Sequence, residues 1–408
     1  MGAVLSRLII LVGTIFIVRL LGNEEYGQFA ILHSTLNMAS VFAGFGLGIT
    51  ATKHVAEFKT REPLRLGRIL TLLGRTALVS GFVFAVSLAL GSSVIAASVL
   101  NAPHLESMIV LLSVAIFFGT LDGYQSGALL GFEAVRESTL GLLLASLLSM
   151  PITIGLTMTF GLAGTVGGFV LTSMIQCAIS RWILAKTVRH FSIPVVRDNL
   201  LLESGLLWKF AFPALLSGAM VAPVHWICHV LVINLPNGKT EMAVLGIASQ
   251  WYQAILFLPG AAGRIALPVL TDVLAESQAS RAVKVLIASV LANSMVAVPV
   301  AIIIGLASPW VMGMYGDAYI SEWPVLAVAV AAGVVSAICV PVGQTLAAKG
   351  HMWMGWLMNI GWAAIYIGVS YSLIEFGALG VAGGMAVAYL CHLGWISIWS
   401  WWYLKSSQ

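Results

Sequence analysis

Charged residues are scarce in this sequence. Only 9% of its 408 residues are Asp, Glu, Lys or Arg, whereas an ordinary soluble domain carries about 25%. So few charges cannot cover the surface of a water-soluble chain of this size. Hydrophobic residues make up 60% of the sequence, and the mean hydropathy is +0.99. The composition therefore excludes a soluble globular protein and indicates an integral membrane protein.

Cysteine is scarce as well, and its four copies lie singly within apolar runs. No two of them have the spacing of a metal site, and a disulfide framework would need close pairs in a small secreted chain. We expect these residues to be small hydrophobic members of the core. They are Cys177, Cys228, Cys339 and Cys391.

Long polar loops are missing too. Apolar runs of about 18 to 25 residues recur along the whole chain, and each is long enough to cross a bilayer as a helix. The first run contains Arg7 and is followed by no small-residue cleavage site, so we expect it to remain as the first helix rather than act as a signal peptide. The fold class predicted is an all-α polytopic membrane protein with about 12 transmembrane helices, without an extramembrane domain. The predicted spans are 3–21, 27–50, 69–90, 106–130, 138–159, 163–185, 208–233, 242–271, 283–305, 323–347, 353–374 and 378–402.

The net charge of +4 predicts no nucleic-acid partner, because no soluble basic domain carries it. Its distribution is informative, since positive residues favour cytoplasmic loops. With the N-terminus inside, only Arg19 and Lys239 fall on the outer side, whereas loops 51–68 and 186–209 are basic. We therefore expect a bacterial inner-membrane protein with both termini in the cytoplasm. The inner cations of these two loops are Lys53, Lys59, Arg61, Arg65, Arg68, Lys186, Arg189, Arg197 and Lys209.

A weak internal repeat relates the two halves at a nearly constant offset. Glu24 matches Glu241, "HVAE" ending at Glu57 matches "VLAE" ending at Glu276, and "QSGALLG" from Gln125 matches "QTLAAKG" from Gln344. Six spans per half give two parallel six-helix bundles related by a pseudo-two-fold axis along the membrane normal, with the substrate site in a central cavity between them. The predicted domains are 1–186, a cytoplasmic connecting loop 187–207 that acts as a flexible tether, and 208–408.

The turn "VRLLGNEEYGQFAIL" from Val18, followed by "GFGLGITATKHVAEF" from Gly44, resembles the start of the polysaccharide flippases, the Wzx-type exporters of the MOP superfamily. In that family an Arg-x-Leu-Gly-x-x-x-Tyr-Gly turn joins the first two helices, and a Gly-rich second helix ends in a basic residue. The segments "MGMYGDAYISEWPVLAVAVAAG" from Met312 and "QTLAAKGHMWMG" from Gln344 resemble its C-terminal part.

The resemblance implies a transporter rather than an enzyme. Its substrate would be an oligosaccharide linked to undecaprenyl diphosphate, moved from the inner to the outer leaflet by alternating access for O-antigen or other cell-surface polysaccharide. It also implies membrane lipids and the polysaccharide polymerase machinery as partners, and no cofactor. Two alternatives stay open: a drug/cation antiporter of the same superfamily, and a membrane-embedded glycan polymerase or ligase.

Ionisable residues within spans are costly and usually face a partner or a cavity. We predict that Arg7, Arg75 and Arg264 lie at one level in the inner half and bind the diphosphate, because guanidinium groups pair bidentately with phosphate. Lys53 joins them through the family resemblance. The alternative for Arg7 and Lys53 is snorkelling to the inner interface.

Acidic and polar residues within spans give further candidates. Asp122 and Asp272 are predicted to be either counter-charges for the arginines or binding sites for a coupling proton or sodium ion. The side chains predicted to contact sugar hydroxyls are Gln250, Tyr252 and Gln253. His33 and Asn37 lie four residues apart on the second helix and are predicted to line the cavity or to bond across helices.

His225 and His229 have the i, i+4 spacing of a metal pair, but the sequence offers no third ligand near them. We therefore predict no metal site and interpret both residues as interfacial histidines.

Overall fold

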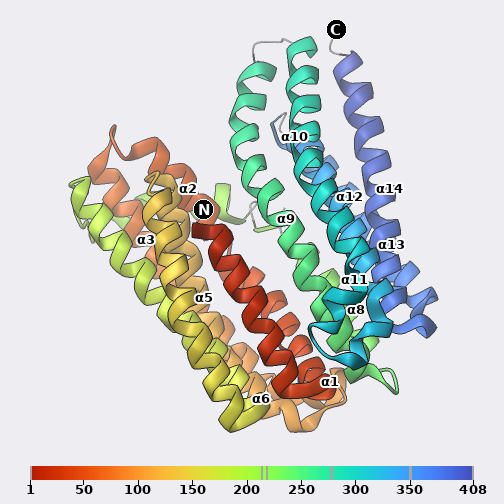
Figure 1. Cartoon of the computed structure of the whole chain (residues 1–408). Coiled ribbons are helices and arrows are strands. Elements are labelled where there is room, and N and C mark those ends of the chain that lie inside the picture. The colour runs from red at the N-terminus through yellow and green to blue at the C-terminus, as the bar shows by residue number, and fades with distance from the viewer. Residues whose placement is uncertain (1, 213–214, 217–218, 276–278, 349–351, 407–408) are drawn as a thin grey trace. The chain divides into compact units, whose positions relative to one another are not determined.

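The computed structural model describes the backbone of residues 2–212, 215–216, 219–275, 279–348 and 352–406, and the side chains of these residues except 258, 261–283, 344–353, 401 and 403–406. Every regular element in these ranges is helical (Figure 1). The chain forms two compact units, Met1–Trp226 and Ile227–Gln408. Each unit is described by itself below.

The N-terminal unit is built on long apolar helices, two of which turn back on themselves. At 1.5 Å per residue, α6 (Val135–His190) would be about 84 Å long if straight, far more than the ~30 Å of a hydrocarbon core. It reverses at Gly161, where φ is 55°, and α1 (Gly2–Gly44) reverses at Gly22, where φ is 73°. Each of these helices therefore supplies two spans. The other elements are α2 (Leu47–Phe58), α3 (Pro63–Leu90), α4 (Ser92–Val94), η1 (Ile95–Val99), η2 (Pro103–Leu105), α5 (Glu106–Gly131), η3 (Leu200–Glu203) and η4 (Leu207–Ala211).

Glycines bring α2 and α5 into close contact. A Cβ atom on Gly127 would clash with the backbone of Gly48, including its carbonyl oxygen. The hydroxyl of Thr52 donates to the Gly127 carbonyl at 2.8 Å and so bridges the two helices. The Gly-rich second helix therefore serves packing against α5. Its neighbours form an apolar core that includes Leu47, Ala51, Val55, Phe58, Leu66, Leu73, Tyr124, Leu129 and Phe132.

The C-terminal unit repeats this helical plan. Its centre is a buried polar contact in which the hydroxyl of Tyr252 donates to the hydroxyl of Tyr389 at 2.9 Å and lies 3.2 Å from that of Ser336. The elements are α8 (Val221–Ile233, which begins within the N-terminal unit), α9 (Gly238–Ala275), α10 (Ala279–Leu306), α11 (Ser308–Gly313), η5 (Asp317–Glu322), α12 (Trp323–Ala348), α13 (Met352–Ser372), η6 (Ile374–Phe376) and α14 (Gly377–Ser406).

The internal repeat is visible in a turn that occurs once in each half of the chain. Gly161 has φ 55° and ψ −132°, and Gly377 has φ 57° and ψ −131°. The Glu25 carboxylate lies 3.3 Å from the position of a Cβ atom on Gly161, and the Glu241 carboxylate stands against Gly377 in the same way. The same number of residues separates the two glycines and the two glutamates. The equivalent of Glu241 is therefore Glu25, which corrects the sequence-based pairing with Glu24.

Over the described residues each predicted span lies largely in helical structure, with the span 208–233 divided between η4 and α8, so the predicted all-α polytopic fold is confirmed. Seven helices of the described chain are long and apolar enough to cross a membrane, and two of these are the kinked α1 and α6. One detail differs from the prediction. The span predicted over 27–50 is broken at Phe45 and Gly46 and continues as α2.

The division between the units, at Trp226 and Ile227, lies later in the chain than the predicted boundary at 207/208. Contacts explain the difference. The indole nitrogen of Trp226 donates to the hydroxyl of Thr35 at 3.0 Å. Trp208, on η4, has its ring 6.5 Å from that of Phe45. The residues after the connecting loop are thus held by α1 and α2.

The cysteine prediction is confirmed for three residues and wrong for the fourth. Cys177, Cys228 and Cys339 are buried, whereas Cys391 is exposed on α14. All four are free thiols.

Candidate functional site: the charged groups of the N-terminal unit

Arg7 lies half-buried on the first half of α1 and faces the second half, where its charge acts on the ring of His33. His33 and Asn37 are bonded within this helix rather than across helices, since His33 Nδ1 and Asn37 Nδ2 are 3.3 Å apart. The His33 ring also stacks on Phe29 at 6.1 Å and meets Phe169 of α6 edge-on at 5.2 Å. The charge of Arg7 therefore acts on a ring that belongs to a polar and aromatic cluster.

The opposite face of the same helix is apolar. Leu5, Leu8 and Phe16 are about half exposed and line one side of a cavity of about 350 Å³. The side chains of α6 that complete it are Leu147, Met150, Pro151 and Ile154. At 100° per residue, position 7 lies on the other side of the helix from positions 5, 8 and 16. The first span therefore separates a cation on one face from an apolar groove on the other.

Lys53 is held at the end of α2 by an aromatic ring. Its Nζ lies 4.2 Å from the centroid of the Phe210 ring, which belongs to η4. A cation over a ring face is stabilised by the quadrupole of the ring. Lys53 is exposed there, and its charge acts on the neighbouring His54.

His54 is buried in the same aromatic contact. Its ring stacks on Phe58 at 5.9 Å and meets Phe210 at 5.6 Å, and its Nδ1 is 3.4 Å from a carboxylate oxygen of Glu57. Burial, followed by the positive charge of Lys53, lowers the pKa of His54 below its ordinary value. The imidazole is therefore held neutral near pH 7.

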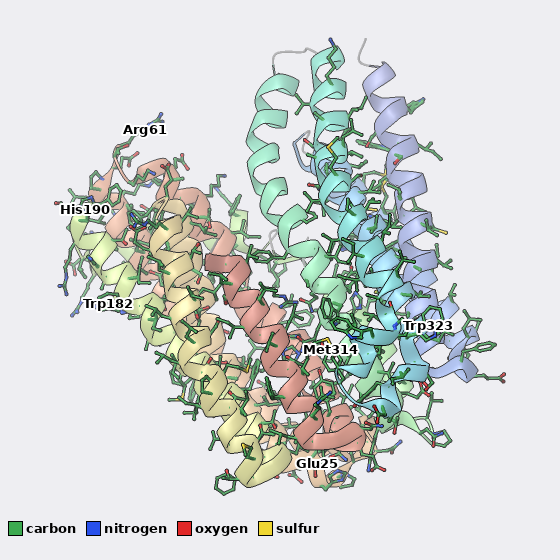
Figure 2. The ribbon with its side chains drawn as sticks, in the orientation of Figure 1. Glu25, Arg61, Trp182, His190, Met314 and Trp323 are labelled. Atoms are coloured by element: carbon green, nitrogen blue, oxygen red, sulfur yellow. The ribbon has the colours of Figure 1, made fainter. Side chains whose placement is uncertain are left out.

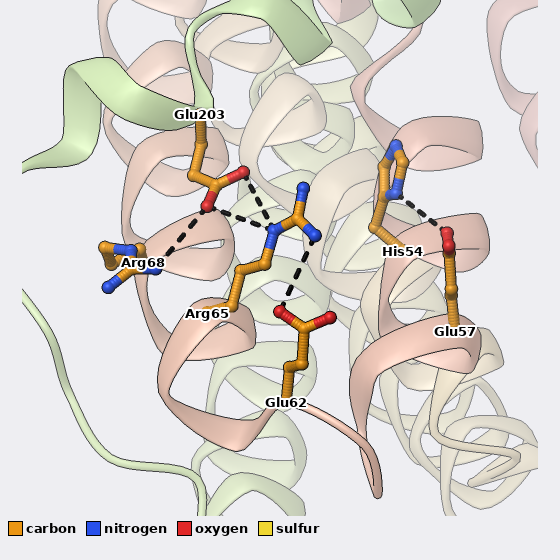
Figure 3. A network of polar contacts seen from close by, with 6 residues as sticks. All are labelled: His54, Glu57, Glu62, Arg65, Arg68 and Glu203. Carbon is orange, nitrogen blue, oxygen red and sulfur yellow. Dashed lines mark hydrogen bonds and ion pairs between the residues drawn. The ribbon is translucent and has the colours of Figure 1, made fainter.

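A second charge cluster joins the connecting loop to the start of α3 (Figure 3). Glu203 is 6% exposed, and both of its carboxylate oxygens accept from Nε of Arg65 at 3.2 Å. Arg68 Nη2 lies 3.7 Å from the same carboxylate, and Arg65 Nη1 lies 3.6 Å from Glu62. A buried carboxylate with two guanidinium partners is strongly held in place. The final part of the loop is therefore fixed to α3.

Sequence reasoning missed this role of Glu203 because it interpreted residues 187–207 as a flexible tether. One signal was present, namely that the connecting loop carries two acidic residues, Asp198 and Glu203, on the same predicted side as a loop with five cations. Gly67 adds a second anchor, since a Cβ atom there would clash with the carbonyl oxygen of Pro194.

Lys59 is likewise neutralised within the unit. Its Nζ donates to Glu133 Oε1 at 2.7 Å. This hydrogen bond and the charge of Lys59 lower the pKa of the Glu133 carboxyl. Lys59, Arg65 and Arg68 thus have internal partners.

The structure does not group Arg75 with Arg7. Arg75 is exposed on α3 and shares its face with Leu78, Val79 and Phe82, which are 47%, 63% and 62% exposed. An exposed aliphatic face is typical of contact with lipid, where a long arginine extends toward the interface. Arg75 therefore differs from the half-buried Arg7 in its exposure, whereas the predicted depth of the three arginines stays a prediction.

Asp122 lies half-buried between α5 and α6 in a set of neutral polar groups. Ser126 Oγ donates to Asp122 Oδ1 at 3.5 Å, and Gln176 and Ser180 are further hydrogen-bond partners of its carboxyl. None of the ion pairs among the described side chains includes Asp122. Hydroxyl and amide oxygens around a carboxylate are suited to a proton or a sodium ion. The alternative role as a counter-charge for Arg75 is not seen.

The remaining predicted residues belong to α9. The side chains of Arg264 and Asp272 lie outside the described residues. Gln250 is half-buried and Gln253 is exposed. Tyr252 is buried and bonded to Tyr389 inside the C-terminal unit. Its hydroxyl is not presented to a sugar, which corrects that part of the prediction.

His229 is buried on α8 and His225 is partly buried. Within the described part of the chain no group of three or more His, Cys, Asp or Glu side chains has the arrangement of a metal site.

The fold is shared with solved transporters. An inward-facing multidrug resistance MATE family transporter of the MOP superfamily matches 98% of this chain and 95% of its own with a TM-score of 0.80 at 14% identity. The lipid II flippase MurJ in its inward closed conformation matches 97% of this chain and 86% of its own with a TM-score of 0.75 at 12% identity. A MOP superfamily transporter from Pyrococcus furiosus gives a TM-score of 0.69. The class is therefore a multi-pass membrane protein with the MOP transporter fold.

The family follows from the sequence profile. The profile described as Polysaccharide biosynthesis protein matches residues 1–274, well over half of the chain. The chain belongs to this family. The descriptions of its curated relatives and of the solved structures with this fold name a polysaccharide export protein, transporters and a flippase, and none of these descriptions names an enzyme.

Two curated relatives carry the same description, EPS I polysaccharide export inner membrane protein EpsE. The protein from Ralstonia nicotianae is 29% identical over 191 residues, and that from Ralstonia solanacearum is 30% identical over 196 residues. Each alignment covers 46% of this chain and 44% of the relative. The match thus spans less than half the length of these relatives.

Proposed function

We propose that this protein is a flippase that moves an oligosaccharide linked to undecaprenyl diphosphate from the inner to the outer leaflet of the bacterial inner membrane, by alternating access. The observation that carries the proposal is membership of the polysaccharide biosynthesis family, together with the MOP fold that the chain shares with a lipid II flippase. The basic inner loops support the proposed orientation with both termini in the cytoplasm. The polysaccharide polymerase is the proposed neighbour in export.

The two faces of the first span support a binding mode in which the polar and the apolar parts of the substrate contact different surfaces. The diphosphate and glycan would meet the face that carries Arg7, with Lys53 and Arg264 as further phosphate ligands. The polyprenyl tail would stay on the lipid side, where the groove lined by Leu8 and Phe16 is apolar. Such a division keeps polar groups out of hydrocarbon throughout transport.

The test is flipping of a fluorescent lipid-linked oligosaccharide by the full-length chain in proteoliposomes. We expect Arg7→Gln to reduce the initial rate by at least about 10-fold, since a bidentate charged contact is worth about 1.5–3 kcal/mol. Arg75→Gln is the matched control, because this cation lies on the exposed aliphatic face of α3. Unchanged flipping by both Arg7→Gln and Arg264→Ala would refute the phosphate site. No flipping by the wild-type chain would refute the function.

A coupling ion is the second part of the proposal. Asp122 is the proposed site for a proton or sodium ion during the return step, because its carboxyl is held by neutral donors rather than by a cation. Asp272 is the other candidate that the sequence offers. We expect Asp122→Asn to remove the dependence of transport on an imposed ion gradient. Asp198→Asn, at an exposed loop position, controls for the loss of one negative charge.

Export of cationic drugs is the rival function, since the solved structures with this fold include multidrug MATE transporters. A cavity for cationic drugs would need acidic or aromatic walls. The described interior of the first span carries Arg7 instead, and a cation there disfavours cationic ligands. Uptake of ethidium by inverted vesicles distinguishes the two functions, because a flippase of this kind would give no ion-dependent ethidium transport.

A further inference from the structure

The final turns of α6 carry a second set of cations, which differs from the set bound to Glu203. Arg181, Lys186, Arg189 and His190 are all exposed there. No Asp or Glu occurs anywhere between Glu137 and Asp198. No ion pair among the side chains that the structure describes involves Arg181, Lys186 or Arg189, whereas Lys59, Arg65 and Arg68 each have an acidic partner. The charge of this set is therefore not neutralised by the protein.

Two of these residues, Lys186 and Arg189, share one face of α6 with an exposed tryptophan. Positions 182, 186 and 189 fall within one stripe of a helix, and Arg181 borders it. Trp182 is 65% exposed, and Lys186 Nζ lies 6.0 Å from the centroid of its ring. Figure 2 shows His190 near the end of the N-terminal unit that carries Arg61, Trp182 on the same side but closer to the middle, and Glu25 at the opposite end.

The same stripe continues toward the middle of the span with aliphatic residues. Leu171 and Met174 are 39% and 38% exposed, and Ala178 is also exposed. Along one face of one helix, the surface thus changes from aliphatic, through an indole ring, to cationic. This order matches acyl chain, glycerol and phosphate in a lipid leaflet, because tryptophan prefers the interface and Lys or Arg bind the headgroup.

We propose that this surface, formed by Leu171, Met174, Ala178, Arg181, Trp182, Lys186 and Arg189, is a binding site for an anionic phospholipid of the inner leaflet. The occupant follows from charge complementarity: its headgroup must bear a net negative charge, and its acyl chains must lie along the aliphatic part of the stripe. This site lies on the outer surface of the helix and is separate from the proposed substrate site at Arg7.

Two roles that need no bound lipid would also place cations at this end of α6. Basic residues in a last helical turn interact with the helix dipole, and basic residues near a span end direct topology. Both roles would leave the affinity for an anionic lipid unchanged when the charges are removed, provided that the protein still inserts. Lipid affinity therefore separates these roles from the proposed site.

The experiment is native mass spectrometry of the detergent-solubilised full-length chain, titrated with dioleoylphosphatidylglycerol or with zwitterionic dioleoylphosphatidylcholine. We expect a preference for phosphatidylglycerol that the triple variant R181Q/K186Q/R189Q loses. Each cation near a membrane surface raises the affinity for anionic lipid by about 5-fold. The triple variant should therefore bind phosphatidylglycerol on the order of 100-fold more weakly. The matched control is R61Q/R136Q/R197Q, which removes three exposed cations that do not share this stripe.

The outcomes separate the site from general electrostatics. An equal loss in both triple variants, or no loss in either, would overturn the proposal. Displacement of phosphatidylglycerol by millimolar inorganic phosphate at constant ionic strength would overturn it in favour of a free-anion site. If the triple variant does not fold, the single variant Trp182→Leu serves instead, with an expected affinity loss of a few-fold, and an unchanged affinity would count against the site.

Discussion

The backbone N–H of Ala378 donates a 2.7 Å hydrogen bond to the carboxylate of Glu241. The donor is one of the unpaired N–H groups at the start of α14, so a side chain from α9 caps a helix that lies more than a hundred residues away in the chain. Glu25 stands in the same relation to the turn at Gly161 in the N-terminal unit. The acidic residues that interrupt the first apolar run therefore belong to a turn that both halves share.

This cap should contribute measurably to stability. We expect Glu241→Ala to lower the free energy of unfolding by about 1–2 kcal/mol, because it removes a charged acceptor from a helix N-terminus. The midpoint of thermal unfolding in detergent measures the effect. Glu375→Gln, an exposed neighbour on η6, should leave that midpoint unchanged. A larger shift for Glu375→Gln than for Glu241→Ala would contradict the capping role.

The contact between α2 and α5 predicts opposite results at two glycines of the same helix. We expect Gly127→Ala to destabilise the protein by about 1–3 kcal/mol, because the new methyl group would meet the backbone of Gly48. Gly123→Ala meets nothing within 4 Å and should be neutral or stabilising by up to about 1 kcal/mol, since alanine has the higher helix propensity. Chemical denaturation of both variants under one set of conditions makes the comparison. Equal effects would show that the two helices are not in contact at Gly127.

The ion cluster at Glu203 predicts that the connecting loop is held rather than free. We expect Glu203→Gln to cost about 1–3 kcal/mol, reduced from the value of a fully buried pair because Arg65 and Arg68 are 35% and 28% exposed. Limited trypsin digestion at Arg197 should become faster in this variant. Glu62→Gln is the control, because this partner of Arg65 is 50% exposed and should change the digestion little. Digestion of Glu203→Gln at the wild-type rate would contradict the anchor.

His54 predicts a dependence of stability on pH. Its folded pKa lies below the ordinary value of 6.5 through burial and the charge of Lys53, so the unfolded chain binds more protons between the two values. Stability is therefore complete above pH 6.5 and falls as the pH drops below it. The other groups that act on the ring are Glu57, on its own helix, and Arg65 of α3.

Thermal unfolding measured from pH 7.5 to 5.5 tests this dependence. We expect His54→Phe, which keeps a ring between Phe58 and Phe210, to flatten the pH profile. A wild-type profile that stays flat below pH 6.5, or an unchanged slope in the variant, would show that His54 does not titrate on unfolding.

Local patterns in the sequence were sufficient for much of this protein. Apolar runs of membrane length defined the twelve helices, because hydrogen-bonded helices are the only way for such segments to cross hydrocarbon. The basic loops and the repeated turn were also readable, although the repeat was placed one residue away at Glu24.

The direction in which side chains point depended on tertiary structure. Position along the spans places Arg7 and Arg75 at a similar depth, yet Arg7 faces a neighbouring helix and Arg75 lies on an exposed aliphatic face. Tyr252 was predicted to be open to a sugar and is bonded to Tyr389 instead. Depth along a span is a local property, whereas orientation is set by which helices are neighbours. For the same reason only the folded chain shows Glu203 between two arginines, since those partners lie more than a hundred residues before it.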